Sequence, residues 1–490
     1  MIIDPSVARN MSNLEQMYVD NNYFRFQHFD SKQGKRLAAV AYLSVIVNQQ
    51  TLNKQFVRKI NEDILAQENP TAESILVSLR SLGIVTEIDE MGMVADMISD
   101  AGIVIFIEGL TVCYGIGIPG YETRAVDQPS SEINVRGPRE GFTEDLKVNM
   151  GLVYRRMKTT KLKSKIFVLG RESQTKVMVV YLDDQVDASV LREVEERIES
   201  VKLNIVVDSA QIEEWIQDSP YSPFPQIMNT ERPDRVVTAL NLGKVIIFTD
   251  GSPNALIAPS TFTDFLHPSE DLYEKFYFAN FLRLLRMLTL LISLCGPSLY
   301  IALTTFHLEM IPTPLMLTFL STKAGIPFPT FLEALIMEVA FEILREASIR
   351  LPRTVGQSVS IVGALIIGEA AVQSGIISRP MVIVVAMTGI ASFTIPSFNT
   401  AITLRLLRFP LIFIAAWTGV LGLALGMFAI VLHLCSLRSF GKLYLPTFNS
   451  HRWKDVTEHY LLLPIKHRRQ SKNDTSYASM EGQVREHEDH

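Results

Sequence analysis

Charged side chains almost disappear from the second half of this sequence. Between residues 354 and 435 there are four of them, Glu369, Arg379, Arg405 and Arg408. A water-soluble core does not need so long an apolar stretch, whereas a helix that crosses a lipid bilayer needs about 20 mostly apolar residues. The lack of charge therefore excludes an ordinary soluble protein and predicts a membrane domain. The sequence up to Arg286 carries charges throughout, which is typical of a water-facing half.

Cysteine is also rare, and its spacing excludes two classes of small domain. Cys113, Cys295 and Cys435 are too far apart for a CxxC pair or a disulfide framework, so we expect buried thiols. The nine histidines are scattered and contain no HxxxH pair. We therefore predict no metal site and no cofactor.

Motifs that bind nucleotides or build a hydrolase are missing as well. The sequence has no GxxxxGK[ST] phosphate loop, no GxGxxG after a strand and no GxSxG. Gly115 and Gly117 form an isolated fragment, and the pair Asp183 and Asp184 is typical of a solvated turn. Basic residues are interleaved with acids, which argues against a nucleic-acid-binding stripe. We predict that the protein is not an enzyme and that its front half serves regulation or assembly.

The water-facing half divides into two predicted subdomains. Residues 1–92 are expected to be mostly helical, with the apolar segment 37–48 buried. Residues 93–265 alternate strands with helices, which is typical of an α/β domain. The expected strands are 102–109, 111–117, 165–170, 176–183, 204–208 and 244–251, and the main helices are 144–158 and 188–201. The first ten residues have no apolar signal-peptide core, so we expect this half to be cytoplasmic.

Residues 266–440 are predicted to form an α-helical, multi-pass membrane domain. Four spans are expected, at 287–306, 355–375, 380–402 and 410–435. Pro297 and Pro396 should disturb the first and the third. Residues 441–490 are predicted to be a basic and then disordered tail. The excess of Lys and Arg at the start of this tail favours a cytoplasmic C-terminus and an even number of spans.

The segment 331–350, between the first two spans, is too charged to cross a membrane alone. Glu338, Glu342 and Glu346 are each four residues apart and therefore share one face of a helix. The other side of this helix is apolar. We expect an amphipathic helix that lies along the membrane interface. Packing within a protein assembly and a solvated linker helix are the alternatives.

The span 355–375 has one polar face. At 100° per residue, five side chains fall within an arc of about 80°, and they are Ser358, Val362, Leu365, Glu369 and Gln373. An apolar constriction followed by a ring of acids suits a cation pore if several copies surround an axis, so these five are the pore-lining candidates. Alternatively, Glu369 hydrogen-bonds to a neighbouring helix. The three other charges are expected at helix ends, reaching the interface, and they are Arg379, Arg405 and Arg408.

Five blocks of this sequence match one known protein family, and the blocks are long and follow the same order. They are VRGPREGFTEDLKVNMGLVYRR (135–156), YSPFPQIMNTERPDRV (221–236), PFPTFLEALIMEVAFEILREASIRLPRTVGQSVSIVGALIIGEAAV (327–372), ASFTIP (391–396) and LRSFGKLYL (437–445). Together they resemble the A subunit of GerA-family spore germinant receptors, and with the pattern between them they cover about residues 100–445. The resemblance implies a receptor subunit in the inner membrane of a bacterial spore.

The resemblance also implies partners and a mechanism. A transporter-like B subunit recognises the nutrient, and a lipoprotein C subunit completes the receptor. The A subunits assemble as a ring, a pentamer, that forms a nutrient-gated channel for monovalent cations. Carried over to this sequence, the block IVGALIIGEAAV puts Val362 at the constriction, with Leu365 and Glu369 beside it. Glu369 replaces a Gln that is common in the family, and its charge should strengthen cation preference if it faces the pore.

Other functions stay open on the sequence alone. A secondary transporter subunit is one alternative, although the sequence shows no inverted repeat and no paired broken helices in two halves. A membrane-anchored scaffold for germination proteins is another. Within the family, a homologue dedicated to ion release rather than to a particular nutrient is also compatible with these residues.

Overall fold

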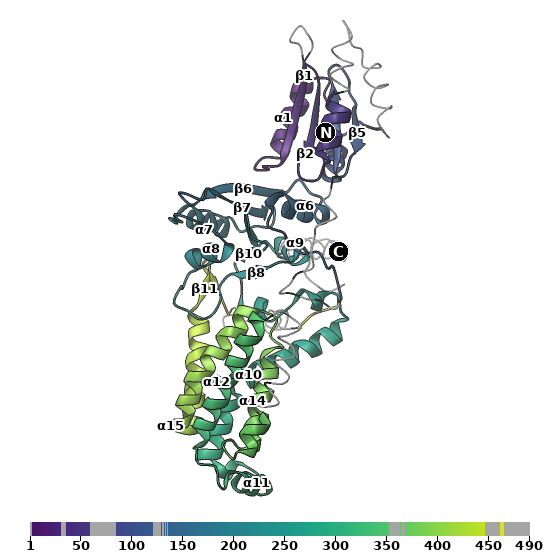
Figure 1. The fold of residues 1–490 in the computed structure, drawn as a ribbon. Helices are drawn as coiled ribbons and strands as arrows, with labels where there is room; N and C mark the ends of the chain where they lie inside the picture. The colour runs from purple at the N-terminus through teal and green to yellow at the C-terminus, as the bar shows by residue number, and fades with distance from the viewer. Residues whose placement is uncertain are drawn as a thin grey trace, which may run out of the picture. The chain divides into compact units, whose positions relative to one another are not determined.

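The computed structural model describes residues 2–30, 36–58, 85–120, 129, 132, 134, 136–351, 363, 368–445 and 461–464. These residues belong to two compact units. The first unit comprises residues up to Pro220 together with Ile227–Ser260, and the second comprises Tyr221–Gln226 and the chain from Thr261 onwards to His467. Figure 1 shows the first unit as two sheets with helices and the second as a helical bundle.

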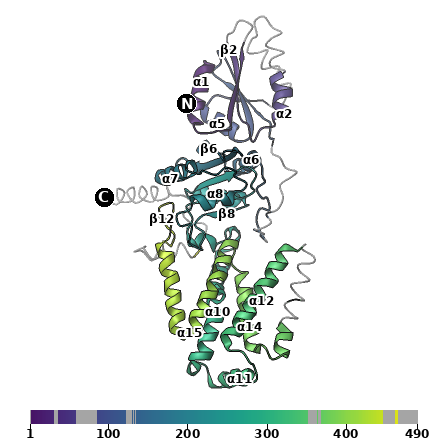
Figure 2. The same ribbon diagram turned by 60° about the vertical axis from the view of Figure 1, so that its left-hand side comes forward.

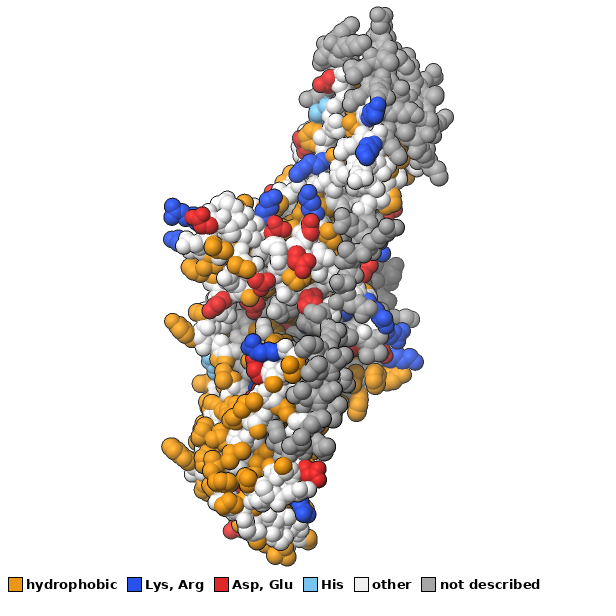
Figure 3. Space-filling model, viewed as in Figure 1, with side chains coloured by type: hydrophobic (Ala, Val, Ile, Leu, Met, Phe, Trp, Pro, Cys, Tyr) orange, Lys and Arg blue, Asp and Glu red, His pale blue; other side chains and the backbone are white. Residues whose placement is uncertain are grey.

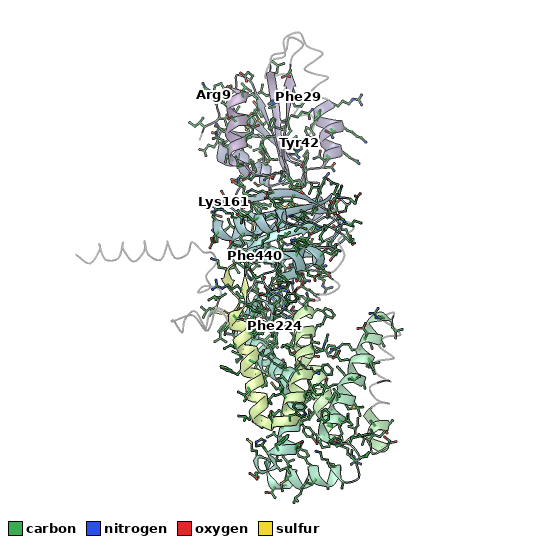
Figure 4. The ribbon with its side chains drawn as sticks, turned by 90° about the vertical axis from the view of Figure 1, so that its left-hand side faces the viewer. Arg9, Phe29, Tyr42, Lys161, Phe224 and Phe440 are labelled. Carbon is green, nitrogen blue, oxygen red and sulfur yellow. The ribbon has the colours of Figure 1, made fainter. Side chains whose placement is uncertain are left out.

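The first sheet is built from the start of the chain. Its strands are β1 (Phe24–Asp30), β2 (Arg36–Leu43), β3 (Thr86–Ile88), β4 (Gly102–Ile107) and β5 (Cys113–Gly117), in the order β1-β2-β4-β5-β3. All neighbouring strands are antiparallel. The helical elements with it are α1 (Val7–Met17), α2 (Gln49–Thr51), the π-helical turn Leu52–Val57 and α5 (Met91–Ser99). Phe29 of β1 and Tyr42 of β2 come from paired strands (Figure 4).

This sheet corrects the expectation that residues 1–92 are mostly helical. The apolar segment that begins at residue 37 is largely the strand β2, and its residues Ala38–Ala41 are buried on both faces. A short apolar run that is buried on both sides carries no alternation, so its periodicity does not separate strand from helix. β2 also pairs with β4, so a division at residue 92 would cut through one sheet. The segment 59–84 lies outside the described residues.

The second sheet follows the expected α/β pattern more closely. Its strands are β6 (Leu162–Leu169), β7 (Thr175–Leu182), β8 (Met228–Thr230), β9 (Val245–Thr249) and β10 (Ala255–Ala258), in the order β6-β7-β9-β10-β8. The helices are α6 (Leu146–Arg156), α7 (Ala188–Glu199), α8 (Ser209–Ile216) and α9 (Pro233–Asn241). The predicted helices 144–158 and 188–201 are confirmed as α6 and α7. Each starts at an aspartate whose carboxylate accepts backbone N–H groups of the first turn.

The predicted strand 204–208 is not formed. Ile205 and Val207 are exposed, and the backbone N–H of Val206 donates to the Ser173 hydroxyl instead of to a neighbouring strand. Asp208 then caps α8 by accepting the N–H of Ala210 at 3.0 Å. Asp208 therefore begins a helix directly after the apolar residues 204–207, and these residues do not join the sheet.

The second unit is a bundle of helices. They are α10 (Phe276–Phe306), α11 (Thr313–Lys323), α12 (Thr330–Arg350), α14 (Arg379–Ser392) and α15 (Phe398–Ser436), followed by a small hairpin of β11 (Arg438–Ser439) and β12 (Lys442–Leu443). By length and composition, α10 and α15 can each cross a membrane, and they are the two described helices that qualify. Hydrophobic side chains gather over this bundle in Figure 3.

The four expected spans agree with the observed helices to different degrees. The residues 287–306 are helical and form the second part of α10, which is long and apolar enough to cross a membrane. Most of 355–375 lies outside the described residues. The span 380–402 is too long, because α14 ends at Ser392 and the chain is not helical around Pro396. Proline lacks the N–H that would continue the helix.

The span 410–435 is wrong as a single straight helix, because α15 folds back on itself at Gly419. This glycine has φ 65° and ψ −144°, which is not helical. A Cβ on Gly426 would lie 2.7 Å from Cδ2 of Leu411, although 15 residues of straight helix would separate them by about 22 Å. The two limbs of α15 therefore pack against each other, as Figure 2 shows. An apolar core between α10, α12, α14 and the first limb includes Ile301, Met337, Met381 and Ile412.

Candidate functional site

The pore-lining candidates are only partly described. Ser358, Val362 and Leu365 lie outside the described residues. Glu369 and Gln373 are on the helical stretch 368–373 and are both exposed, and Gln373 donates from Nε2 to Glu369 Oε1 at 2.9 Å. The structure therefore brings these two side chains together within one helix. The pore interpretation of all five stays a prediction.

The three glutamates of the expected acidic face have different surroundings. Glu338 is fully buried, Glu342 is partly buried and the Glu346 side chain is 62% exposed. Glu346 pairs with Arg350 at 2.6 Å on the outside of α12. Helix α12 thus turns Glu338 into the bundle, which differs from a single face turned towards water or headgroups.

Glu338 is buried because Arg408 neutralises it. Arg408 NH1 donates to Glu338 Oε2 at 2.5 Å, and Arg408 Nε donates to the backbone oxygen of Ser293 at 2.8 Å. The NH2 group of Arg408 also lies 3.3 Å from the Ser293 hydroxyl. One guanidinium therefore joins α12, α10 and the first limb of α15. A buried charge is tolerated when it is paired and hydrogen-bonded in this way.

This pairing corrects the expectation that Arg405 and Arg408 sit at helix ends. Both lie within the first limb of α15, and the Arg408 side chain is 1% exposed. The partner, Glu338, is 70 residues away in the sequence. The one sequence signal for this site was the retention of an arginine in an apolar run, which marks a functional or structural pairing. Arg379 does begin α14 and is exposed, as expected.

Two further arginines extend the cluster along the bundle. Glu342 Oε1 lies 3.1 Å from Arg345 NH1 and 3.7 Å from Arg405 Nε. Arg345 also donates from NH2 to the Ser392 hydroxyl at 2.9 Å, so it reaches α14. Its guanidinium lies over the rings of two phenylalanines, Phe341 and Phe393, at 5.3 and 4.9 Å from their centroids. We call the five side chains Glu338, Glu342, Arg345, Arg405 and Arg408 the buried ion-pair network.

A second charged cluster lies where α10 begins. The carboxylate of Asp271 is 1% exposed and accepts from Arg283 Nε at 2.9 Å and from Arg286 NH1 at 2.9 Å. His267 lies close to this cluster. Burial, and then the positive charge of Arg283, lower the pKa of His267 to about 3. These contacts fix the first turns of α10 to the segment before it.

The same end of the bundle holds two of the sequence blocks quoted above together. The Tyr444 hydroxyl donates to the backbone oxygen of Pro225 at 2.7 Å, and the Ser439 hydroxyl donates to that of Gln226 at 2.7 Å. Phe224 and Phe440 are both buried here (Figure 4). The blocks 221–236 and 437–445 are far apart in sequence, and these contacts bring residues of both together.

The first unit contains a cavity that the sequence did not indicate. Its volume is about 1060 Å³, and its lining includes Arg25, Tyr42, Lys147, Lys176 and Asp250. Charges of both signs therefore face one space. Among the residues that the structure describes, no group of three or more His, Cys, Asp or Glu side chains is placed to hold a metal ion. Of the cysteines, Cys113 is buried as expected, while Cys435 is exposed.

Comparison with known proteins finds relatives along most of the chain. The family model described as Bacillus/Clostridium GerA spore germination protein matches residues 12–473. The uncharacterized membrane protein YfkQ of Bacillus subtilis (strain 168) is 41% identical over 462 residues, which are 94% of this chain and 90% of that protein. Spore germination protein KA of the same organism is 39% identical over 460 residues, which are 93% of this chain and 85% of that protein. Neither name is that of an enzyme.

Among solved structures, one similar chain is the N-terminal domain of the A subunit of the Bacillus megaterium spore germinant receptor GerK3. The match covers 54% of this chain and 98% of that one, with 22% sequence identity and a TM-score of 0.42.

Proposed function

Because this chain belongs to the GerA family of spore germination proteins, we propose that it is the A subunit of a nutrient germinant receptor in the spore inner membrane. Its B subunit, related to transporters, would recognise the nutrient, and a lipoprotein C subunit would complete the complex. The membrane association itself is indicated by the apolar helices α10 and α15 and by a relative that is named a membrane protein.

Both ends of the bundle segment would lie on the cytoplasmic side, which is the core side of the spore. Supporting this, the Asn280 side chain, near the start of α10, exchanges hydrogen bonds with the backbone of Leu462, which follows α15 in the chain. Asn280 Nδ2 donates to the Leu462 oxygen at 3.0 Å, and the Leu462 N–H donates to Asn280 Oδ1 at 2.6 Å. Because the chain before the first span contacts the chain after the last one, both lie on the same side of the membrane, which favours an even number of crossings.

We further propose that copies of this chain form a ring, a pentamer, in which Ser358, Val362, Leu365, Glu369 and Gln373 line a ligand-gated cation path. The observation that carries this proposal is the exposure of Glu369. Its hydrogen bond to Gln373 lies within its own helix, so the carboxylate is available to face an axis formed by other copies. A ring of such acids would attract cations.

Electrical recording from the full receptor in a planar bilayer tests this function. Unitary current steps carried by K⁺ or Na⁺ support a channel. Saturable transport without steps would instead support a transporter subunit, and absence of any flux would support a scaffold. Either of the last two results would refute the channel proposal while leaving the family assignment intact.

A further inference from the structure

The buried ion-pair network carries one positive charge in excess. It holds three arginines and two glutamates, joined by the contacts already described. The charged groups that act most strongly on Arg345 and Arg405 all belong to this network. Among the described residues, no acidic side chain other than Glu338 and Glu342 forms an ion pair with these three arginines. An uncompensated charge in an apolar bundle is costly, so a counter-ion is expected.

Arg405 has guanidinium N–H groups that donate no hydrogen bond to the described residues. Its one ion pair among the described residues is the 3.7 Å approach to Glu342 Oε1, which is too long for a hydrogen bond. That same oxygen is already taken by Arg345 at 3.1 Å. Arg345, which shares Glu342 with Arg405, has a buried Nε with no hydrogen-bond partner among the described residues. The Arg405 side chain is 12% exposed, so part of it faces the outside of the bundle.

Arg405 lies near the level at which the first predicted span, 287–306, begins. At one end of the bundle Thr289 and Thr394 share a hydrogen bond of 2.5 Å, and further in Arg408 bonds to Ser293. Arg405 precedes Arg408 by three residues, which is about 4.5 Å along a helix. It therefore lies between these two levels, close to residue 287, where the first apolar span begins.

The outer surface around Arg405 is apolar. Its neighbours Ile402 and Leu406 on the first limb of α15 are 41% and 61% exposed. Arg405 therefore emerges at the edge of a surface suited to lipid tails. A guanidinium at this position can reach the headgroup layer while its stem stays in the hydrocarbon.

We propose that Arg405, with Arg345 behind it, binds the phosphate of an anionic phospholipid headgroup. The planar fork of a guanidinium donates two parallel hydrogen bonds to a phosphate, and basic pockets between membrane helices hold lipid headgroups in this way. A lipid with a net charge of −1 would neutralise the excess charge of the network. The site is independent of whether the chain forms a channel, because it needs only the folded bundle.

Lipid retention on the purified full-length chain tests the site. Native mass spectrometry would compare retention of phosphatidylglycerol with that of phosphatidylcholine, which has a phosphate but no net charge. We expect phosphatidylglycerol to be retained preferentially, and Arg405→Gln to weaken its binding about fivefold, which corresponds to roughly 1 kcal/mol for one arginine. The control is Arg379→Gln, an exposed arginine at the start of α14, which should leave the preference unchanged.

A second variant separates lipid binding from a loss of structure. Glu342→Gln removes the carboxylate that competes for both arginines, so it should strengthen phosphatidylglycerol binding while Arg405→Gln weakens it. Equal preference in the parent and in Arg405→Gln would overturn the proposal. So would weaker binding in Glu342→Gln, or full competition by inorganic phosphate at matched ionic strength, which would indicate a site for a free anion.

Discussion

Glu338 and Arg408 form an ion pair of 2.5 Å inside the helical bundle, with side-chain exposures of 0% and 1%. The pair joins helix α12 to the first limb of α15, and Arg408 adds the backbone of Ser293 in α10. Three helices of a predicted membrane domain are therefore held at one point by charge. The stability of the bundle should depend on this pair far more than on the ion pairs at its surface.

Removing one partner of the pair should destabilise the bundle strongly. Arg408→Met leaves the Glu338 carboxylate buried without a counter-charge, and such changes cost about 3–5 kcal/mol. The surface variant Glu346→Gln, whose partner Arg350 is exposed, should cost less than about 1 kcal/mol. Thermal unfolding of the purified chain in detergent measures both. The double variant Arg408→Met with Glu338→Leu should recover part of the loss, and equal losses in the single and double variants would argue against the pair.

The turn at Gly419 should not tolerate a side chain. Its φ of 65° is strained for any L-residue, and a Cβ there would lie 2.9 Å from Cε1 of His307. We expect Gly419→Ala to lower the free energy of unfolding by about 1–3 kcal/mol. Gly368→Ala is the matched control, because its Cβ would meet Val382 at an ordinary 3.6 Å. Equal unfolding temperatures for the two variants would show that α15 does not turn at Gly419.

Acid should destabilise the second unit partly through His267. Its folded pKa is lowered to about 3, whereas the ordinary value is 6.5, so between these values the unfolded chain binds the proton and the folded chain does not. Stability therefore falls as pH drops from 6.5 towards 3, by at most about 1.4 kcal/mol per pH unit. Replacing His267 by Asn should flatten this part of the pH profile of the unfolding temperature. An unchanged slope would remove His267 as the cause.

The constriction hypothesis predicts opposite effects for two substitutions at Val362. Val362→Ala should loosen the constriction and raise ion release without nutrient, because a smaller side chain lets water enter. Val362→Phe should block release while the receptor still assembles. Flux of K⁺ from spores or vesicles, together with subunit levels by immunoblot, measures both effects. Parental behaviour of both variants would mean that the segment 355–375 does not line the path.

Replacing Glu369 should change the preference for cations over anions rather than the opening of the channel. Glu369→Gln removes a charge from the exposed carboxylate and keeps the hydrogen-bonding shape next to Gln373. We expect the preference for cations over anions to fall, because the ring of acids is lost. Reversal potentials under a salt gradient measure this preference. If they stay at the parental value, Glu369 does not face the pore.

Part of the fold was predictable because its signals are local. The loss of charge after Arg286 indicates an apolar bundle, and the span 287–306 appears within α10. Helices α6 and α7 were predicted from their local residue pattern, and in the structure each is capped by an aspartate. The strand β2 was not predictable in the same way. It lies inside the sheet between β1 and β4, and helices α1 and α5 pack against it. A strand buried in this way needs no alternation of apolar and polar residues, which is the pattern that marks a half-buried strand.

The amino-acid sequence by itself determined that the second half is apolar, that Glu369 is an isolated acid in an apolar stretch and that the chain is similar to germinant receptor subunits. Only the tertiary structure decided that Arg408 reaches Glu338, that α15 turns at Gly419 and that Arg405 has, among the described residues, a single ion pair at 3.7 Å. The reason is that composition and the spacing of apolar residues depend only on the residues near each position in the sequence. A charge pair, a reversal and a missing partner depend on which distant segments pack together.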